Sequence, residues 1–171
     1  MDTIFLTGFM GAGKTTVGRE LGQAMGMSVY DTDALIEQLL KKPIPVIFED
    51  DGEAAFREYE EKVLRSVAGH GAVVTTGGGI ILKETNRRIM RQNGIVIYLH
   101  TDPETILHRL HDDTERPLLK NQRPKQVSSM LAARLPLYLE ADYTVNTSMK
   151  SVETIVDEIS AFLVRHQRFW A

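Results

Sequence analysis

The sequence predicts an α/β fold in which a five-stranded parallel sheet carries helices on both faces. Short apolar runs rich in β-branched or aromatic residues alternate with stretches whose apolar residues recur at helical spacing. That alternation is typical of a parallel sheet covered on both sides, with ligand sites at the carboxyl ends of its strands. The predicted strands span residues 3–7, 27–30, 72–76, 95–99 and 142–146.

Helical patterns fill the intervals between these strands. One helix is expected to stop at Asn93-Gly94 and the next to start at Asp102-Pro103, because Gly favours helix ends and Asp favours helix starts. The apolar residues that mark the helical faces are Val17, Leu21, Ala24, Met25, Ile89, Met90, Ile106, Leu107, Leu110, Ile155, Ile159, Phe162 and Leu163.

Two stretches depart from the alternation, and we expect them to handle the substrate. Between residues 34 and 69 the pattern is helical throughout, interrupted by Pro43 and Pro45, which predicts an inserted helical subdomain. Residues 112–125 have little periodicity, many charges and two prolines, which indicates a mobile loop or lid. Neither stretch resembles a linker, so we expect a single domain over residues 1–171.

Composition excludes several functional classes. The 171 residues include 20 basic and 23 acidic side chains with no basic stripe, which disfavours a nucleic-acid partner. The chain has no cysteine, so disulfides, thiolate metal sites and cysteine nucleophiles are excluded. The first apolar run ends at Gly8, too soon for a signal peptide or membrane helix. A soluble, cytoplasmic protein without a membrane partner is therefore the default expectation. We also expect a monomer whose partners are small molecules.

Residues 8–15 read Gly-Phe-Met-Gly-Ala-Gly-Lys-Thr, the Walker A pattern of nucleotide-binding proteins. They lie between a predicted strand and a predicted helix, as that motif requires. Its glycines let successive amides point at phosphate oxygens, Lys14 would bridge the outer phosphates, and the Thr15 hydroxyl would reach Mg²⁺. The alternative is a glycine-rich turn that happens to contain Lys-Thr. The expected phosphate-binding residues are Gly11, Ala12, Gly13, Lys14, Thr15 and Thr16.

The acid that would support the metal is not at the end of the third predicted strand, which runs into Gly77-Gly78-Gly79 without a carboxylate. Asp31 and Asp33, which end the second strand, are the nearest candidates. In an Asp-Thr-Asp step the two acids can point in different directions, so that one faces Mg²⁺ and the other an acceptor. The alternative is that Asp31 merely caps a helix and Asp33 occupies its first turn.

More than one class of nucleotide-binding protein fits the phosphate loop. A GTPase-type switch is disfavoured because the chain has neither an Asp-x-x-Gly nor an Asn-Lys-x-Asp motif. A kinase for a nucleoside monophosphate or another small metabolite agrees with the helical insertion, the lid and the short chain. The acceptor site has to separate these possibilities.

The acceptor candidates form a scattered set of arginines and glycines. Arg57 shares a helical face with Glu60, and a carboxylate can hold a guanidinium in place for a second anion. Residues 77–79 can offer backbone amides to ligand oxygens. Arg116, in the predicted lid, could fold onto the phosphates, and Arg134 lies on a helix. Each of these also has a plainer interpretation, as a solvated arginine or a loose turn.

Taken together, the motifs resemble those of shikimate kinases, in order and over nearly the whole chain. They are Gly-Phe-Met-Gly-Ala-Gly-Lys-Thr-Thr-Val-Gly at 8–18, Asp-Thr-Asp at 31–33, Gly-Glu-x-x-Phe-Arg-x-x-Glu at 52–60, Thr-Gly-Gly-Gly at 76–79, Arg-Pro-Leu-Leu at 116–119 and Arg-x-Pro-Leu-Tyr at 134–138. The resemblance implies a P-loop kinase that uses ATP and Mg²⁺ to convert shikimate to shikimate 3-phosphate in chorismate and aromatic amino acid biosynthesis.

The resemblance also implies residue roles in the acceptor site. Asp33 would hold the shikimate hydroxyls and assist deprotonation of the one that attacks. Arg57 and Arg134 would bind the substrate carboxylate, with backbone contacts from Gly78 and Gly79.

On the nucleotide side, Lys14 and Arg116 would stabilise the moving phosphoryl group, and Asp31 would join Thr15 in the Mg²⁺ shell. Arg109 occupies the place of a family arginine that stacks on adenine, but it could equally be a solvated helix residue. Val145-Asn146-Thr147 departs from the Val-Asp-Thr that the family often has at this point.

Overall fold

The computed structural model describes residues 2–112 and 124–166. It contains a five-stranded sheet of order β2-β3-β1-β4-β5, in which every pairing is parallel. The predicted α/β class and its parallel sheet are confirmed, and each strand lies within two residues of its predicted bounds. The strands are β1 (Thr3–Thr7), β2 (Val29–Asp31), β3 (Val73–Thr75), β4 (Gly94–His100) and β5 (Tyr143–Asn146).

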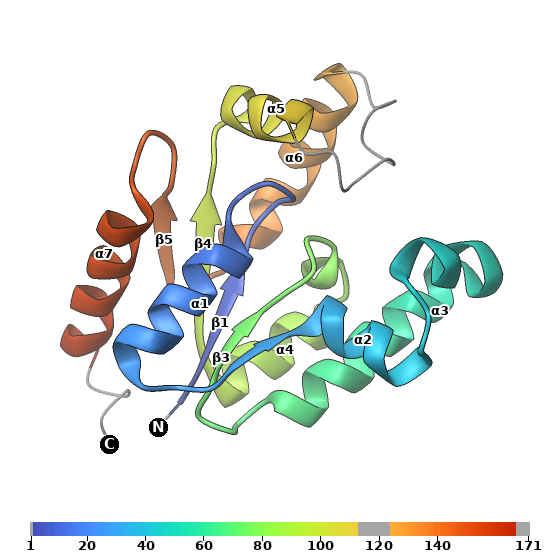
Figure 1. Cartoon of the computed structure of the whole chain (residues 1–171), viewed down its shortest axis with the longest axis horizontal. Helices are drawn as coiled ribbons and strands as arrows, with labels where there is room; N and C mark the ends of the chain where they lie inside the picture. Colours follow the sequence, from blue (N-terminus) through green and yellow to red (C-terminus); the bar gives the residue numbers. More distant parts are fainter. Residues whose placement is uncertain (1, 113–123, 167–171) are drawn as a thin grey trace.

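Helices cover both faces of the sheet, as Figure 1 shows. Helices α1 and α7 pack on one face, and α3, α4 and α6 pack on the other. The helices are α1 (Lys14–Met25), α2 (Thr32–Leu40), α3 (Ile44–Val67), the 3₁₀ helix η1 (Ile80–Leu82), α4 (Glu84–Asn93), α5 (Pro103–Asp112), α6 (Pro124–Tyr138) and α7 (Val152–Arg165). Within the described part of the chain, no helix is both long and apolar enough to cross a membrane.

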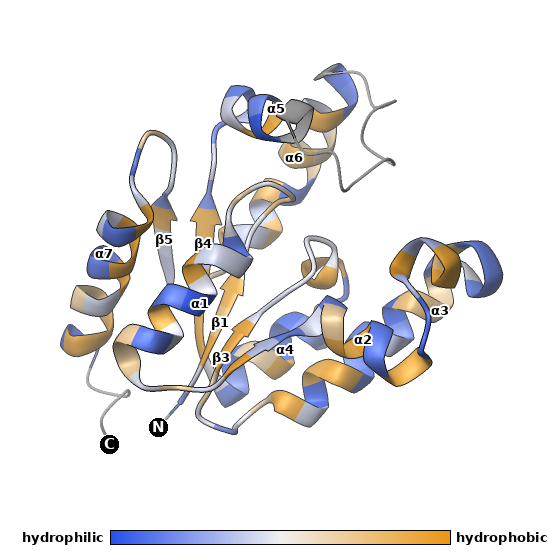
Figure 2. Ribbon diagram, in the orientation of Figure 1, coloured by the Kyte–Doolittle hydropathy of each residue, from blue (hydrophilic) through white to orange (hydrophobic). Residues whose placement is uncertain are grey.

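The core consists of two apolar layers separated by the sheet. In β1, Ile4 and Leu6 point toward α1 and α7, whereas Phe5 points toward α3 and α4. All three are fully buried, and each such side chain contributes about 1.5–3 kcal/mol of hydrophobic free energy. In Figure 2 the inner strands β1, β3 and β4 are accordingly mostly orange. Burial on both faces is why β1, β3 and β4 read as short apolar runs rather than as alternating patterns.

The predicted helical insertion corresponds to α2 and most of α3, which Figure 1 shows projecting beyond the edge of the sheet. Pro43 precedes α3 and breaks the run, as expected from the sequence. A second break lies inside α3 at Gly52, whose φ of 81° is outside the helical region. A small separate core of Ile36, Ile47, Phe56 and Val63 holds the two helices together. The predicted lid at 112–125 lies, apart from its ends, outside the described residues.

Candidate active site

A cavity of about 470 Å³ opens at the carboxyl ends of the strands, where a doubly covered parallel sheet is expected to bind ligands. It is large enough for a nucleotide-sized ligand. Its walls come from the phosphate loop, the end of β2, the loop after β3, α5 and the segment after β5. The residues predicted from the sequence that line it are Gly11, Ala12, Gly13, Lys14, Thr15, Thr16, Asp31, Asp33, Gly78 and Arg109.

The phosphate loop joins β1 to α1 in the conformation that its glycines allow. Gly11 and Gly13 have φ values of 76° and 88°, which a side chain would make costly, and α1 begins directly after Gly13. The Lys14 ammonium donates to the carbonyl oxygens of Gly8, at 2.8 Å, and Phe9, at 2.9 Å. The lysine is therefore held over the loop, beside the positive end of a helix, where phosphate binds.

Asp31 caps a helix and also directs an oxygen toward the phosphate loop, so the cap that the sequence offered as an alternative does not exclude a place near Mg²⁺. Its Oδ1 accepts hydrogen bonds from the backbone amides of Asp33 and Ala34, both at 3.0 Å, and so caps α2. Its Oδ2 accepts from Thr75 Oγ1 at 2.7 Å and faces Thr15 Oγ1 at 3.5 Å. The helix cap thus orients the other carboxylate oxygen toward the phosphate loop.

The oxygens of Thr15 and Asp31 fit a magnesium ion bound to nucleotide phosphates. Mg²⁺ prefers hydroxyl and carboxylate oxygens and is usually held by one or two protein ligands together with phosphates and water. Among the described residues there is no cluster of three or more acidic, histidine or cysteine side chains that could hold a metal alone. The donor set therefore agrees with a metal that arrives with a nucleotide.

Asp33 lies in the first turn of α2, and its carboxylate and that of Glu60 both lie close to Gly77. A Cβ built on Gly77 would be 2.5 Å from Asp33 Oδ1 and 3.1 Å from Glu60 Oε1, so only glycine fits there. The Gly77 amide donates to Thr32 Oγ1 at 3.0 Å, which anchors the loop to α2. The glycine loop is therefore a close approach between elements and not a loose turn.

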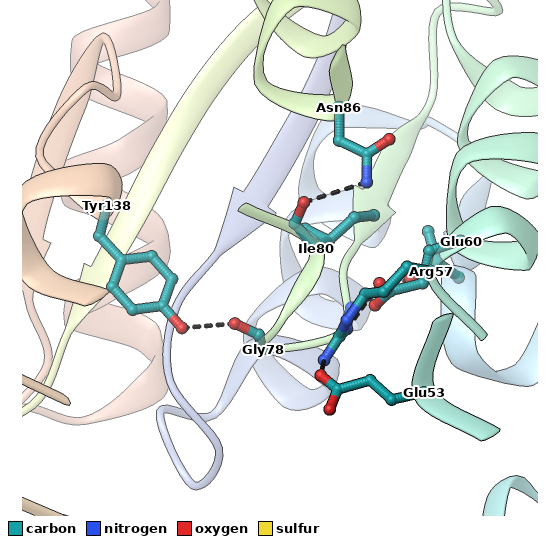
Figure 3. Close-up of polar contacts among 9 residues, drawn as sticks. Glu53, Arg57, Glu60, Gly78, Ile80, Asn86 and Tyr138 are labelled. Atoms are coloured by element: carbon teal, nitrogen blue, oxygen red, sulfur yellow. Dashed lines mark hydrogen bonds and ion pairs between the residues drawn. The ribbon is translucent and has the colours of Figure 1, made fainter. Parts of the chain in front are cut away.

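Arg57 is fixed by two carboxylates, as Figure 3 shows. Its Nη1 donates to Glu60 Oε2 at 2.6 Å and its Nη2 donates to Glu53 Oε1 at 3.0 Å. A Cβ on Gly79 would overlap the guanidinium nitrogens, so the arginine lies flat against that residue. The side chain is 18% exposed, and the interpretation of Arg57 as a solvated surface residue is therefore wrong.

Glu60 is a buried carboxyl group in this region, with only 1% of its side chain exposed. Burial raises the pKa of its carboxyl from 4.5 to about 7, although the Arg57 guanidinium acts in the opposite direction. The Asp33 carboxylate raises this pKa further and Arg134 lowers it. These four groups therefore form one electrostatic unit around the glycine loop.

Arg134 is carried to the same place by α6. Its guanidinium carbon lies 5.7 Å from the centroid of the Phe9 ring in the phosphate loop. It also acts on the pKa of Glu60 and of Tyr138, so it lies within electrostatic reach of both. The structure thus brings Asp33, Arg57 and Arg134 together, whereas Arg116 lies outside the described residues.

The nucleotide end of the cavity contains a predicted arginine and several residues that the sequence did not single out. Arg109 Nη1 donates to the Gly11 carbonyl at 2.9 Å, so this arginine contacts the phosphate loop and is not merely solvated. Asn146, which departs from the family pattern, accepts from the Ser148 amide at 2.9 Å and so supports the turn after β5. Further lining residues are Thr147, Lys150, Val152 and Ile155. Thr147 and Lys150 follow the last strand and Val152 and Ile155 lie at the start of α7, and this position was the only signal in the sequence.

Comparisons with known proteins agree with this geometry. A family model described as "Shikimate kinase" matches residues 10–164. The shikimate kinase of Bacillus cereus (strain G9842) is 45% identical over 159 residues, which cover 93% of this chain and 96% of the relative. That of Geobacter sulfurreducens is 45% identical over 166 residues, covering 96% and 92%. The structure of Acinetobacter baumannii shikimate kinase in complex with shikimate matches with a TM-score of 0.89 and 38% identity, covering 97% and 94%.

The raised pKa of Glu60 predicts a pH-dependent contribution to stability. The folded state holds the Glu60 proton more tightly than the unfolded chain, so this contribution is fully present below pH 4.5 and is lost as the pH rises through about 7. Glu60→Gln is neutral at every pH and should remove this loss. The difference between the free energy of unfolding of Glu60→Gln and that of wild type should therefore shift in favour of the variant, by on the order of 2 kcal/mol, as the pH rises from about 5 to about 8.

Urea unfolding at several pH values measures this difference. Glu49→Gln, the same change at an exposed position of α3, is the control for the chemistry of the substitution. A difference between Glu60→Gln and wild type that does not vary with pH would contradict the prediction.

Proposed function

This chain belongs to the shikimate kinase family, and we propose that it transfers the γ-phosphoryl group of ATP to a hydroxyl group of shikimate. The products are shikimate 3-phosphate, a precursor in chorismate and aromatic amino acid biosynthesis, and ADP. The observation that carries this proposal is the contact between the two loops. A Cβ on Gly78 would be 3.5 Å from both the Gly8 carbonyl oxygen and the Met10 amide nitrogen, so the proposed acceptor loop lies directly beside the proposed phosphate loop.

On the donor side, the phosphate loop and Lys14 bind the ATP phosphates. The amides of the loop and the positive end of α1 face the phosphate oxygens, and the Lys14 ammonium neutralises charge that builds up during transfer. Thr15 and Asp31 hold Mg²⁺, which when bound shields the phosphate charge from the incoming nucleophile. We propose that Arg116 reaches the same phosphates and that Arg109 contacts the adenine base.

On the acceptor side, the substrate carboxylate and hydroxyls require different partners. Arg57 and Arg134 bind the carboxylate, together with the backbone amides of Gly78 and Gly79. Asp33 accepts a hydrogen bond from the attacking hydroxyl and takes its proton. The hydroxyl oxygen then forms a bond to the γ-phosphorus as the bond from that phosphorus to the bridging oxygen breaks, and ADP leaves.

A fixed arginine beside an acid distinguishes this proposal from a nucleotide switch or a generic kinase. A switch needs no acceptor acid, whereas Asp33 lies where the two loops meet. Holding Arg57 between Glu53 and Glu60 costs side-chain entropy, which is worthwhile when the arginine has to bind a small anion in one orientation. A small hydroxy acid with one carboxylate fits this combination.

The function is tested by a coupled assay of ADP release from purified protein. Shikimate, gluconate and each nucleoside monophosphate are supplied in parallel, and only shikimate is expected to stimulate ADP release. Lys14→Ala should keep its fold by circular dichroism and lose transfer, because it lacks the charge that stabilises the moving phosphoryl group. Turnover of a nucleotide or gluconate without turnover of shikimate would overturn the assignment.

The role of Arg57 predicts a specific loss of shikimate binding. Arg57→Ala should raise the KM for shikimate by about ten- to hundredfold, the worth of a charge-assisted hydrogen bond, and should affect the KM for ATP much less. Shikimate methyl ester should be a poor substrate for wild type and show a far smaller penalty from the substitution. Arg65→Ala, at an exposed arginine of the same helix, is the matched control. Equal increases in both KM values would contradict this role.

Asp33 is instead expected to affect the chemical step. Asp33→Asn keeps the shape of the side chain but cannot take the proton from the attacking hydroxyl, so kcat should fall by about 100-fold or more. The measurement is steady-state kinetics at saturating ATP and shikimate, with Asp157→Asn on the exposed surface of α7 as the control. A variant that retained most of the wild-type kcat would rule out this role for Asp33.

A further inference from the structure

Tyr138, the last residue of α6, is buried next to the acceptor loop although nothing in the transfer chemistry requires a phenol there. Its hydroxyl donates to the carbonyl oxygen of Gly78 at 2.6 Å (Figure 3). Only 1% of the residue is exposed, so the contact is shielded from water. Arg134 precedes it by four positions on the same helix, and residues at this spacing share a helical face.

The hydrogen bond acts on the peptide unit that joins Gly78 to Gly79. This unit is planar and, since the described residues contain no cis peptide bond, its carbonyl and its amide N–H point in opposite directions. A donor on the Gly78 carbonyl therefore fixes the direction of the Gly79 amide and polarises it. On the other side of Gly79 lies the guanidinium of Arg57.

We propose that Tyr138 is a positioning residue for the acceptor. Its hydroxyl sets the Gly78–Gly79 peptide at the angle at which the Gly79 amide meets the acceptor carboxylate, and it links this peptide to the helix that carries Arg134. The amide and the arginine are thereby presented to the carboxylate as one unit. This role rests on the proposed function, because it assumes a carboxylate-bearing acceptor at the glycine loop.

A neighbouring tyrosine separates the effect of the hydroxyl from that of the ring. Tyr138 stacks on Tyr98 with ring centroids 4.8 Å apart and planes 1° apart. The Tyr98 hydroxyl does not face the loop but lies 3.0 Å from His100 Nδ1. Burial raises the pKa of both phenols, that of Tyr98 to about 12, so both hydroxyls keep their protons at neutral pH. The two rings share one apolar environment, and their hydroxyls have different partners.

The test compares Tyr138→Phe with Tyr98→Phe in the full-length protein. Each variant removes one buried hydroxyl and keeps its stacked ring. Tyr138→Phe should raise the KM for shikimate by about three- to tenfold, the range expected for one neutral hydrogen bond, and change the KM for ATP by less than about twofold. Tyr98→Phe should change neither KM by more than about twofold. Urea unfolding of both variants measures any shared loss of stability.

The outcomes separate a positioning role from a purely structural one. KM does not depend on the concentration of active enzyme, so partial unfolding of a variant cannot imitate a selective rise in the KM for shikimate. An unchanged KM for shikimate in Tyr138→Phe, an equal rise in both KM values, or equal effects of the two variants would overturn the proposal. Failure of the wild-type protein to phosphorylate shikimate would refute both this role and the proposed function, whereas wild-type turnover with an unaltered Tyr138→Phe would refute only the role.

Discussion

The parallel pairing of β1 with β3 determines where the chemistry can take place. Leu6 of β1 lies opposite Thr75 of β3. Thr76, the residue directly after β3, donates two hydrogen bonds to the Leu6 carbonyl oxygen, one from its amide at 3.2 Å and one from its hydroxyl at 3.0 Å. Two loops rich in glycine therefore leave the sheet side by side at the carboxyl ends of these strands. One is the proposed phosphate loop, and the other is the proposed acceptor loop. Their separation is set by the distance between neighbouring strands, about 4.8 Å, and not by flexible segments.

The loop of residues 77–79 depends on contacts from elements that are far apart in the sequence. Asp33 and Glu60 meet at Gly77, Tyr138 bonds to Gly78, and the Arg57 guanidinium lies against Gly79. At Gly77 and Gly79 the space that a Cβ would need is already taken by functional side chains. Glycine is required here because other groups have to approach the backbone closely, and the loop gains rigidity from the same contacts.

The buried pair of Arg57 and Glu60 is better explained by binding than by stability. Taking two charges out of water costs several kcal/mol, and apolar residues of similar size often stabilise a fold as well as or better than an ion pair. The raised pKa of Glu60 is a direct sign of that cost. What the pair provides is a guanidinium held in one orientation, and that orientation matters only if a second anion binds on its other side. The same reasoning applies to the buried hydroxyl of Tyr138, whose partner belongs to the acceptor loop.

The sequence predicted the helices and strands better than it predicted the contacts between them, and the reason is physical. Apolar periodicity and helix-end signals act over a few residues, so the strands, the end of α4 at Asn93 and the start of α5 at Pro103 could be derived from them. The burial of the Arg57 side chain could not be derived in this way. It depends on the missing Cβ of Gly79, 22 positions away, and on how α3 packs. Tyr138 and Gly78 are 60 positions apart and meet only after α6 has docked on the sheet. Asp31 was left between two interpretations because a carboxylate has two oxygens. Its Oδ1 caps α2 through local contacts, but only the register of β2 against β3 shows that Oδ2 has Thr75 as a separate partner. The sequence motifs thus identify candidate residues singly. The register of the sheet and the missing side chains of the glycines at 77–79 are what bring these residues together in one site.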